Sequence, residues 1–273
     1  MSHAVGGDLA MGAVFNEFIA GLNEDFDLHV VARPNAVRDR LQRAIASTDF
    51  RAQCARMLLE QHVWASQVRQ FFVDPRQRYS LQIFCWPPGF GNDPHCHETW
   101  TVAGVMAGSL LVFRSATSAA DCRASAPILA RTGEAGVLIP PQFHCLRNDG
   151  DETAITFHLF SLDSAEKRPN LEGRPAAAPR FDDDDVVAIV RMVVERRGVE
   201  AADCIHAAFA AVGPTAKLDL VKLMLKLDSG AAIALGRTLS RLVGGPDGGR
   251  LLKLVERLEA VAQGNGVPYL HGS

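Results

Sequence analysis

Apolar residues follow different spacings in successive regions of this 273-residue chain. From about residue 35 to 73 they recur at helical spacing, because Val37, Leu41 and Ile45 stand four positions apart with arginines between them. A second helix is predicted in DFRAQCARMLLEQH, with Asp49 as its N-cap. Residues 1–34 are assigned to an N-terminal segment that is expected to be partly flexible.

From Arg78 to about residue 165 the pattern changes to short runs rich in β-branched and aromatic residues. Glycine, proline and Asn-Asp-Gly signals separate these runs, and NDGDE at 148–152 predicts a hairpin turn between the last two. This spacing is typical of an all-β barrel or sandwich. The runs are YSLQIFCW, TWTVAGVMAGSLLVFRS, APILARTGEAGVLIP and ETAITFHLFSL.

Helical spacing returns near the C-terminus, after a proline-rich and charged linker at 166–181. A helical region is predicted at 182–264, followed by a tail at 265–273. The four aspartates at 182–185 are interpreted as an exposed helix start, since no calcium-loop spacing follows them. The apolar faces of these helices are expected to pack on each other, to cover the barrel, or to form a homodimer.

Composition narrows the classes of function. The net charge of −3 gives no basic footprint for nucleic acid, and no apolar run is long enough for a membrane span. The first residues lack the pattern of a secretory signal. Six cysteines without CxxC spacing favour a reduced, cytoplasmic protein.

Histidines supply the candidate chemistry. His95 and His97, in GFGNDPHCHETW, would share one face of a strand, with Cys96 pointing away. His144, at the end of GVLIPPQFH, could join them from a neighbouring strand. Three neutral imidazoles suit a divalent transition metal such as iron, nickel, copper or zinc. An HxH pair also arises by chance on a strand surface, so the third histidine and the loop context carry this interpretation.

The same residues resemble the two motifs of the cupin superfamily. Gly89, His95 and His97 match the opening of G-x5-H-x-H, and His144 with Asn148 matches H-x3-N. Thr101 and Val102 stand where ordinary cupins have a glutamate ligand. A cupin with three histidines and no glutamate resembles the thiol dioxygenases, the cysteine dioxygenase family. The segments CWPPGFGNDPHCHETWTVAGVMAGSL and TFHLFS extend this resemblance over roughly residues 35 to 165.

The resemblance implies a fold and a set of roles. The fold would be mainly β, a cupin double-stranded β-helix barrel at 35–165 with N-terminal helices and an added C-terminal all-α region. Fe(II) would be the cofactor, held by His95, His97 and His144. Thr156 and His158 match part of the family's catalytic Ser-x-His-x-Tyr strand, whereas Phe160 replaces its tyrosine.

The implied reaction is oxidation of a small thiol, of the cysteine or 3-mercaptopropionate type, by dioxygen to a sulfinic acid. Arg69 falls where the family binds the substrate carboxylate, and a surface ion pair is its alternative role. Trp100 and Phe160 are also assigned to substrate binding, with core packing as the alternative for Trp100. Because Phe160 lacks the phenol, two other functions stay open. They are a three-histidine oxygenase acting on a substrate that is not a thiol, and a non-catalytic binding cupin whose helices contact a partner.

Overall fold

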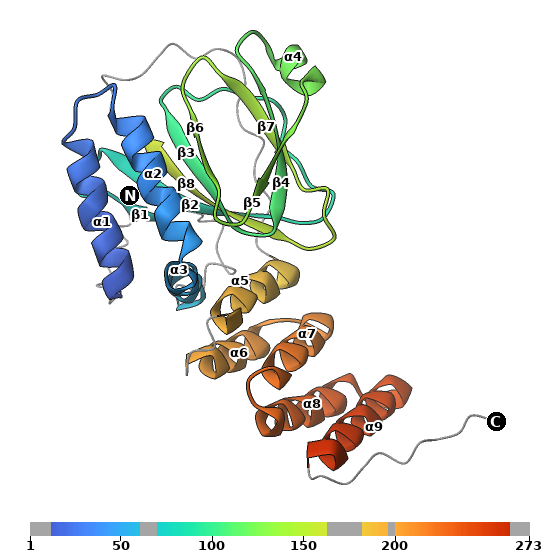
Figure 1. The fold of residues 1–273 in the computed structure, drawn as a ribbon. Helices are drawn as coiled ribbons and strands as arrows, with labels where there is room; N and C mark the ends of the chain where they lie inside the picture. The colour runs from blue at the N-terminus through green and yellow to red at the C-terminus, as the bar shows by residue number, and fades with distance from the viewer. Residues whose placement is uncertain (1–11, 61–69, 163–181, 196–199, 263–273) are drawn as a thin grey trace, which may run out of the picture.

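The structure is a computed structural model that describes residues 12–60, 70–162, 182–195 and 200–262. Two antiparallel sheets face each other in the middle of the chain, helices cover one of them, and further helices form a stack beside the barrel (Figure 1). The larger sheet has the strand order β1-β2-β8-β3-β6, and the smaller has β5-β4-β7. The strands are β1 (Gln70–Val73), β2 (Tyr79–Trp86), β3 (Thr101–Ala107), β4 (Ser109–Ser115), β5 (Ile128–Arg131), β6 (Ala135–Leu138), β7 (Phe143–Arg147) and β8 (Ala154–Ser161).

The connections between the sheets give the barrel its topology. After β3 in the larger sheet, the chain forms β4 and β5 in the smaller, β6 in the larger, β7 in the smaller and β8 in the larger. This repeated crossing is the arrangement of a double-stranded β-helix, or jelly roll, as predicted. The turn at 148–152 is not a hairpin, because β7 and β8 lie in different sheets and do not pair.

Three N-terminal helices cover the outer face of the larger sheet. They are α1 (Ala13–Phe26), α2 (Arg33–Ala46) and α3 (Thr48–Glu60), and the last two were predicted. α1 lies in the segment for which no element was expected, and it buries Phe15, Phe18, Leu22 and Phe26 along one face. Phe157 of β8 meets Phe18 at 5.9 Å and Phe50 at 5.8 Å between ring centroids, so the helices and the sheet share an aromatic core.

Gly104 allows this helical layer to approach the sheet closely. A Cβ atom at this position of β3 would lie 2.4 Å from Cδ1 of Ile45 on α2. Real carbon atoms do not approach so closely, so a larger residue here would force the end of the Ile45 side chain, or α2 with it, to shift.

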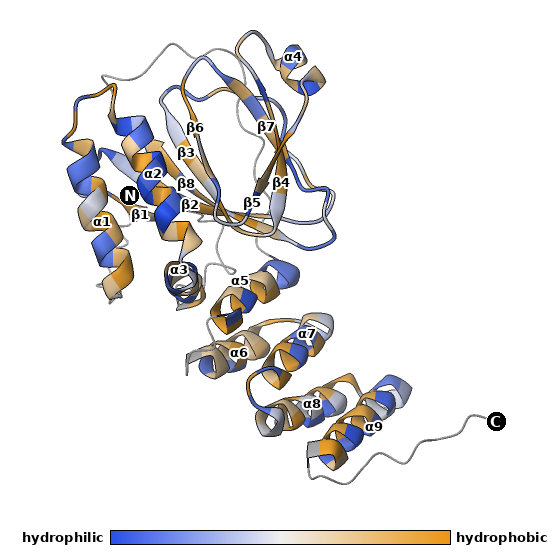
Figure 2. Ribbon diagram, in the orientation of Figure 1, coloured by the Kyte–Doolittle hydropathy of each residue, from blue (hydrophilic) through white to orange (hydrophobic). Residues whose placement is uncertain are grey.

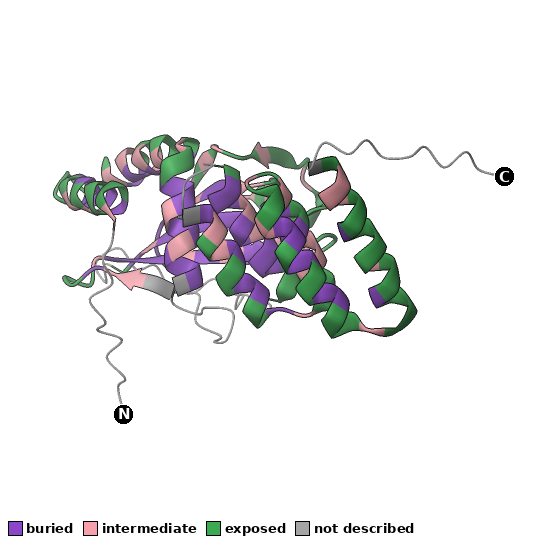
Figure 3. Ribbon diagram, turned by 90° about the horizontal axis from the view of Figure 1, so that it is seen from below, coloured by how far each residue is buried: buried purple, intermediate pink, exposed green. Residues whose placement is uncertain are grey.

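The C-terminal helices form a stack in which neighbours pack in sequence. α5 packs against α3, and an ion pair of 3.6 Å joins Arg51 Nη2 of α3 to Glu195 Oε2 of α5. At the far end of the stack, α9 packs against α8. Hydrophobic residues are concentrated between the layers (Figure 2), and α9 is the most exposed helix of the stack (Figure 3). The helices are α5 (Asp183–Glu195), α6 (Glu200–Ala211), α7 (Pro214–Leu225), α8 (Ser229–Val243) and α9 (Gly245–Ala262).

Two expectations about the helices can be compared with the structure. The aspartates begin α5, where Asp182 and Asp185 each accept a hydrogen bond from the other's backbone N–H at 3.0 Å. More of the described residues lie in helices than in strands, so the expectation of a mainly β chain is not confirmed. None of the described helices combines the length and the apolar character that crossing a membrane requires.

Candidate metal centre

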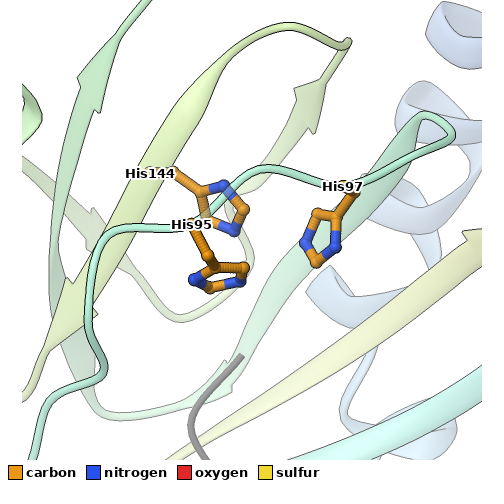
Figure 4. Close-up of side chains that lie close together, drawn as sticks. All are labelled: His95, His97 and His144. Atoms are coloured by element: carbon orange, nitrogen blue, oxygen red, sulfur yellow. The ribbon is translucent and has the colours of Figure 1, made fainter. Parts of the chain in front are cut away.

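The three predicted ligands come together inside the barrel. His144 lies on β7, whereas His95 and His97 come from the loop between β2 and β3 (Figure 4). Their ring centroids are 4.3 to 5.0 Å apart, and one candidate ligand nitrogen from each lies within 4.8 Å of the others. Among the histidine, cysteine and acidic side chains of the described ranges, these three histidines form the group that could hold a metal ion.

The backbone around His95 and His97 differs from the predicted strand. His95 forms a single bridge to His144, through hydrogen bonds of 3.0 and 2.9 Å in the two directions, and the rest of the segment is irregular. Pro94 has no N–H and cannot extend a ladder of strand hydrogen bonds. The bridge nevertheless positions two ligands together. Cys96 is buried, directs its thiol to the carbonyl of His97, and is not part of the cluster.

The loop that carries these ligands is fixed to β7 by further hydrogen bonds. The backbone N–H of Leu146 donates to Asn92 Oδ1 at 2.7 Å, and that of Asn92 donates to the carbonyl of Leu146 at 3.1 Å. A Cβ at Gly91 would meet the same carbonyl at 2.9 Å. The close contact between loop and strand therefore requires glycine at this position.

Asn148, the last residue of the second motif, ties the other end of the loop. Its buried side chain donates to the carbonyls of Trp86 at 2.7 Å and Glu152 at 2.8 Å. Its Oδ1 accepts from the N–H of Gly150 at 2.9 Å. One amide thus joins the end of β2 to the turn before β8, which explains why an asparagine suits this position.

A hydrogen bond orients His95 for metal binding. Its Nδ1 lies 2.9 Å from the carbonyl of Asp93, which can only accept. The ring must therefore carry its proton on Nδ1, and Nε2 keeps a free lone pair. Asp93 pairs with Arg123 at 2.8 Å through its exposed carboxylate, which holds the surface side of this turn.

Burial keeps the histidines neutral. Loss of hydration and, to a smaller extent, repulsion by His95 together lower the pKa of His97 to about 4. The pKa values of His95 and His144 are also lowered, chiefly by burial. Neutral imidazole is the form that binds a metal, since protonated imidazole has no lone pair to donate.

The residues present fit a divalent transition metal. Three neutral imidazoles converge, and Nδ1 of buried His144 has no hydrogen-bond partner among the described residues. Glu98 is exposed and lies outside the cluster, so no described carboxylate completes the set. An all-nitrogen, three-ligand set leaves coordination positions for substrate and is compatible with iron, nickel, copper or zinc.

A second group of polar residues adjoins the cluster on β8. His158 Nε2 and Thr156 Oγ1 are 2.8 Å apart, and Trp86 donates its indole N–H to the same oxygen at 2.8 Å. All three are buried. The pKa of His158 is lowered to about 3, chiefly by burial and to a smaller extent by the nearby His97 and His95. Sequence reasoning did not predict the bond between Trp86 and Thr156, which depends on the pairing of β2 with β8.

Phe160 lies beside these histidines. Its ring centroid is 5.4 Å from that of His97, in an edge contact, and 5.8 Å from that of His158, nearly parallel. Phe84 contacts His158 from another side at 4.6 Å. The position that carries a phenol in the thiol dioxygenases therefore presents an apolar ring to the cluster.

Trp100, another predicted substrate residue, does not lie at the histidine cluster in the structure. Trp100 is buried on the helical side of the larger sheet, with its ring stacked on Phe26 at 5.5 Å. It is not among the residues that line the barrel cavity, and its packing matches the core role given as the alternative for it. Arg69 lies outside the described residues.

A cavity of about 410 Å³ lies between the two sheets. His144, Thr156 and His158 contribute to its wall, so the cavity reaches both the cluster and the β8 network. Most of the remaining wall is apolar, and Gln42, Arg114 and Glu134 are its other polar side chains with hydrogen-bonding groups. Arg114 was not singled out in the sequence, although its alternation with Leu110 and Val112 places it on the inward phase of β4.

No protein-family model and no curated protein matches the chain. Solved structures similar to it include an uncharacterized conserved protein with a double-stranded β-helix domain from Klebsiella pneumoniae, 16% identical, covering 35% of this chain and 76% of that chain with a TM-score of 0.28. A Cupin 2 conserved barrel domain protein from Salinispora arenicola is 17% identical, with 36% and 75% covered and a TM-score of 0.30.

A third similar structure is a recombinant oxalate oxidase in complex with glycolate, 27% identical with a TM-score of 0.27. The match covers 31% of this chain and 42% of that chain. Each of these three likenesses covers about a third of this chain, and none of the three proteins is named as a thiol dioxygenase. The chemistry of the site is therefore argued from its residues.

Proposed function

We propose that the barrel holds Fe(II) through His95, His97 and His144 and oxidises a small thiol to its sulfinic acid. The observation that carries the proposal is the convergence of three neutral imidazoles without a described carboxylate. The resemblance of the motifs to thiol dioxygenases selects this reaction among those open to three-histidine sites. The proposal places the protein in the cytoplasm, where thiols stay reduced.

The overall reaction is R–S⁻ + O₂ → R–SO₂⁻. Both oxygen atoms end on sulfur, which loses four electrons to dioxygen, so no external reductant is required. Iron, when bound, would supply open positions for the thiolate and dioxygen and would lower the pKa of the thiol.

The chain's own residues would orient the reactants and exclude water. The three histidines would hold the metal, and His144 forms part of the cavity wall, so a substrate in the cavity would lie beside this ligand. His158, held by Thr156, presents a neutral imidazole to the same space and can exchange a hydrogen bond with a bound substrate. Phe160 and Phe84 surround this imidazole with apolar rings, which keeps water from the reacting groups.

The apolar ring of Phe160 favours one alternative. Phe160 lies beside the cluster where the thiol dioxygenases have a phenol, so the site lacks the hydroxyl that this family uses with its thiol substrates. A three-histidine oxygenase acting on such a substrate is therefore the second candidate. The third is a binding cupin without oxygenase activity.

Metal analysis followed by oxygen consumption tests the proposal. Protein loaded with Fe(II) should bind about one iron per chain and consume oxygen with cysteine, 3-mercaptopropionate or a related thiol, yielding one sulfinic acid per dioxygen. His144→Ala should lose iron and activity together. His206→Ala, which removes an exposed histidine of α6, is the matched control and should keep both.

The outcomes separate the candidates. Stoichiometric iron without oxygen uptake across a broad thiol panel would reject the thiol dioxygenase. Failure to bind any divalent metal, with His144→Ala indistinguishable from the parent protein, would reject every metal-dependent reading of the site.

A further inference from the structure

The cavity between the sheets is larger and more apolar than a short polar thiol requires. Its volume of about 410 Å³ falls within the range of ligand pockets, which extends from about 300 to 1,000 Å³. The wall extends away from His144 along both sheets and, beside alanines and glycines, includes large aliphatic side chains. These are Leu110, Val112, Ile128, Val137, Leu138 and Leu146.

One cation stands in this wall next to the candidate metal centre. Leu110, Val112 and Arg114 alternate along β4, and all three line the cavity. Arg114 is the direct cross-strand partner of His144 on β7. Directly opposed residues point to the same face with their Cβ atoms about 4.5–5.5 Å apart. The Arg114 side chain therefore starts beside a candidate metal ligand.

The guanidinium of Arg114 differs from those of its neighbours. Arg147 pairs with Asp149 at 2.5 Å, and Arg123 pairs with Asp93 at 2.8 Å. No carboxylate in the described part of the chain pairs with Arg114. Glu134, the acid in the cavity wall, instead accepts from the backbone N–H of Arg131 at 2.8 Å.

An arginine at the wall of an apolar cavity suits a ligand of mixed character. Its planar fork of donors matches the two oxygens of a carboxylate, and the aliphatic wall stabilises an apolar chain. Because Arg114 and His144 are opposed, an anionic group held by Arg114 can lie near the atom that reaches the metal centre, although the Arg114 residue is also exposed to solvent. The remaining wall, toward Leu110 and Leu146, is left for the apolar part.

We propose that Arg114 binds the carboxylate of the substrate, and that the substrate is a mercapto acid with an extended aliphatic substituent. The proposal rests on the thiol dioxygenase function for the sulfur, while the carboxylate and aliphatic subsites rest on the cavity alone. The thiol and carboxylate lie close together at the His144 end, and the aliphatic chain runs between the two sheets.

Calorimetric titration of the metal-free protein with straight-chain carboxylates tests the two subsites without any turnover. Affinity should rise from butanoate to hexanoate to octanoate, by up to about fourfold for each CH₂ that becomes buried. Octanamide, which keeps the chain but lacks the charge, should bind more weakly than octanoate.

Substitutions identify the residues involved. Arg114→Gln should weaken octanoate binding by about tenfold to a hundredfold and leave octanamide nearly unchanged, since only the charged hydrogen bonds are lost. Arg114→Lys should give a smaller loss. Arg131→Gln is the matched control, because this outward residue of β5 carries the same charge, and it should bind octanoate as the parent does. Val112→Phe should reduce the gain from added CH₂ groups while keeping the preference for the acid.

Equal binding of octanoate and octanamide, equal losses in Arg114→Gln and Arg131→Gln, or affinity that does not depend on chain length would each overturn the proposal. The titration needs neither iron nor oxygen, so its result is independent of whether the protein is a dioxygenase. If the protein oxidises cysteine but shows none of these preferences, the substrate proposal fails and the reaction stands.

Discussion

The two sheets of the barrel face the same cavity but have different support. β8 of the larger sheet is buried along nearly its whole length, with Phe157 packed against the helices and His158 directed into the barrel. β4 and β5 of the smaller sheet are mostly half-buried or exposed, although Val112 and Ala130 line the same cavity. One wall is therefore fixed by a dry core, whereas the opposite wall has fewer neighbours and can adapt to a ligand.

The chemistry is divided according to this difference. Thr156 and His158 lie on the fixed wall, which suits groups that need accurate placement. Arg114 and four of the six large aliphatic residues of the cavity wall lie on the smaller sheet, where small shifts alter the fit without disturbing the core. His144, on β7 of the smaller sheet, obtains its support from the loop bridge to His95.

Truncating one aromatic residue on each sheet gives the largest expected contrast. Phe157→Ala should lower the free energy of unfolding by about 3–5 kcal/mol, because it opens a cavity among fully buried rings. Phe113→Ala on the outward face of half-buried β4 should cost under about 2 kcal/mol. Urea denaturation followed by circular dichroism measures both. Similar losses would show that the two sheets are equally supported.

The polar network on the fixed wall should show a smaller effect. Thr156→Val keeps the shape but leaves the indole N–H of Trp86 and Nε2 of His158 without their partner, at a cost of about 1–3 kcal/mol. Thr132→Val removes an exposed hydroxyl that bonds to Gly108 and should change stability by less than about 0.5 kcal/mol. Thermal unfolding compares the two variants, and equal shifts would mean that the β8 network contributes no stability of its own.

The smallest expected effect is a pH dependence of stability in the metal-free protein. The pKa of His158 is about 3 in the folded protein and 6.5 without its surroundings. Below pH 6.5 the unfolded chain therefore takes up a proton that the folded chain does not, and stability falls until the pH approaches 3. Between pH 6.5 and 5.5 this residue should account for about 1 kcal/mol, because the unfolded histidine is already half protonated at pH 6.5.

His158→Gln isolates that contribution. The variant should lose less stability than the parent over the same pH interval, by about the amount assigned to one histidine. Parallel pH profiles for the two proteins would show that His158 is not kept neutral by its surroundings.

Local motifs were the part of the site that sequence reasoning could predict. His95, His97 and His144 carry their chemistry in short segments with turn signals, and they converge as expected. The strand expected at His95 and His97 did not form, because Pro94 interrupts the pairing. The distinct environments of Trp86 and Trp100 depend on strand register and on α1, which short spacing does not reveal. The position of Arg114 could have been inferred from the sequence, because it stands four residues after buried Leu110 in SLLVFRS and therefore on the same face of the strand.

Among the helices, prediction succeeded where the apolar period stood next to clear boundary signals. Pro34 and Pro214 lie in the first turns of α2 and α7, as their fixed backbone angle favours. α1 was not predicted, although Phe15, Phe18 and Phe26 lie on one face of it. The residues that this face packs against, such as Phe157 of β8, are far away in the sequence, so local spacing did not reveal them.

The serial packing of the C-terminal helices sets how far a disturbance can spread. α9 packs against α8, α8 against α7, and α5 connects the stack to α3 and thereby to the sheet that carries β8. In such a linear array, detachment of the outermost helix mainly exposes the surface of the next one. Fraying that begins at α9 would therefore have to pass through several layers before it reached the histidines, so the outer helices can open and close while the barrel stays folded.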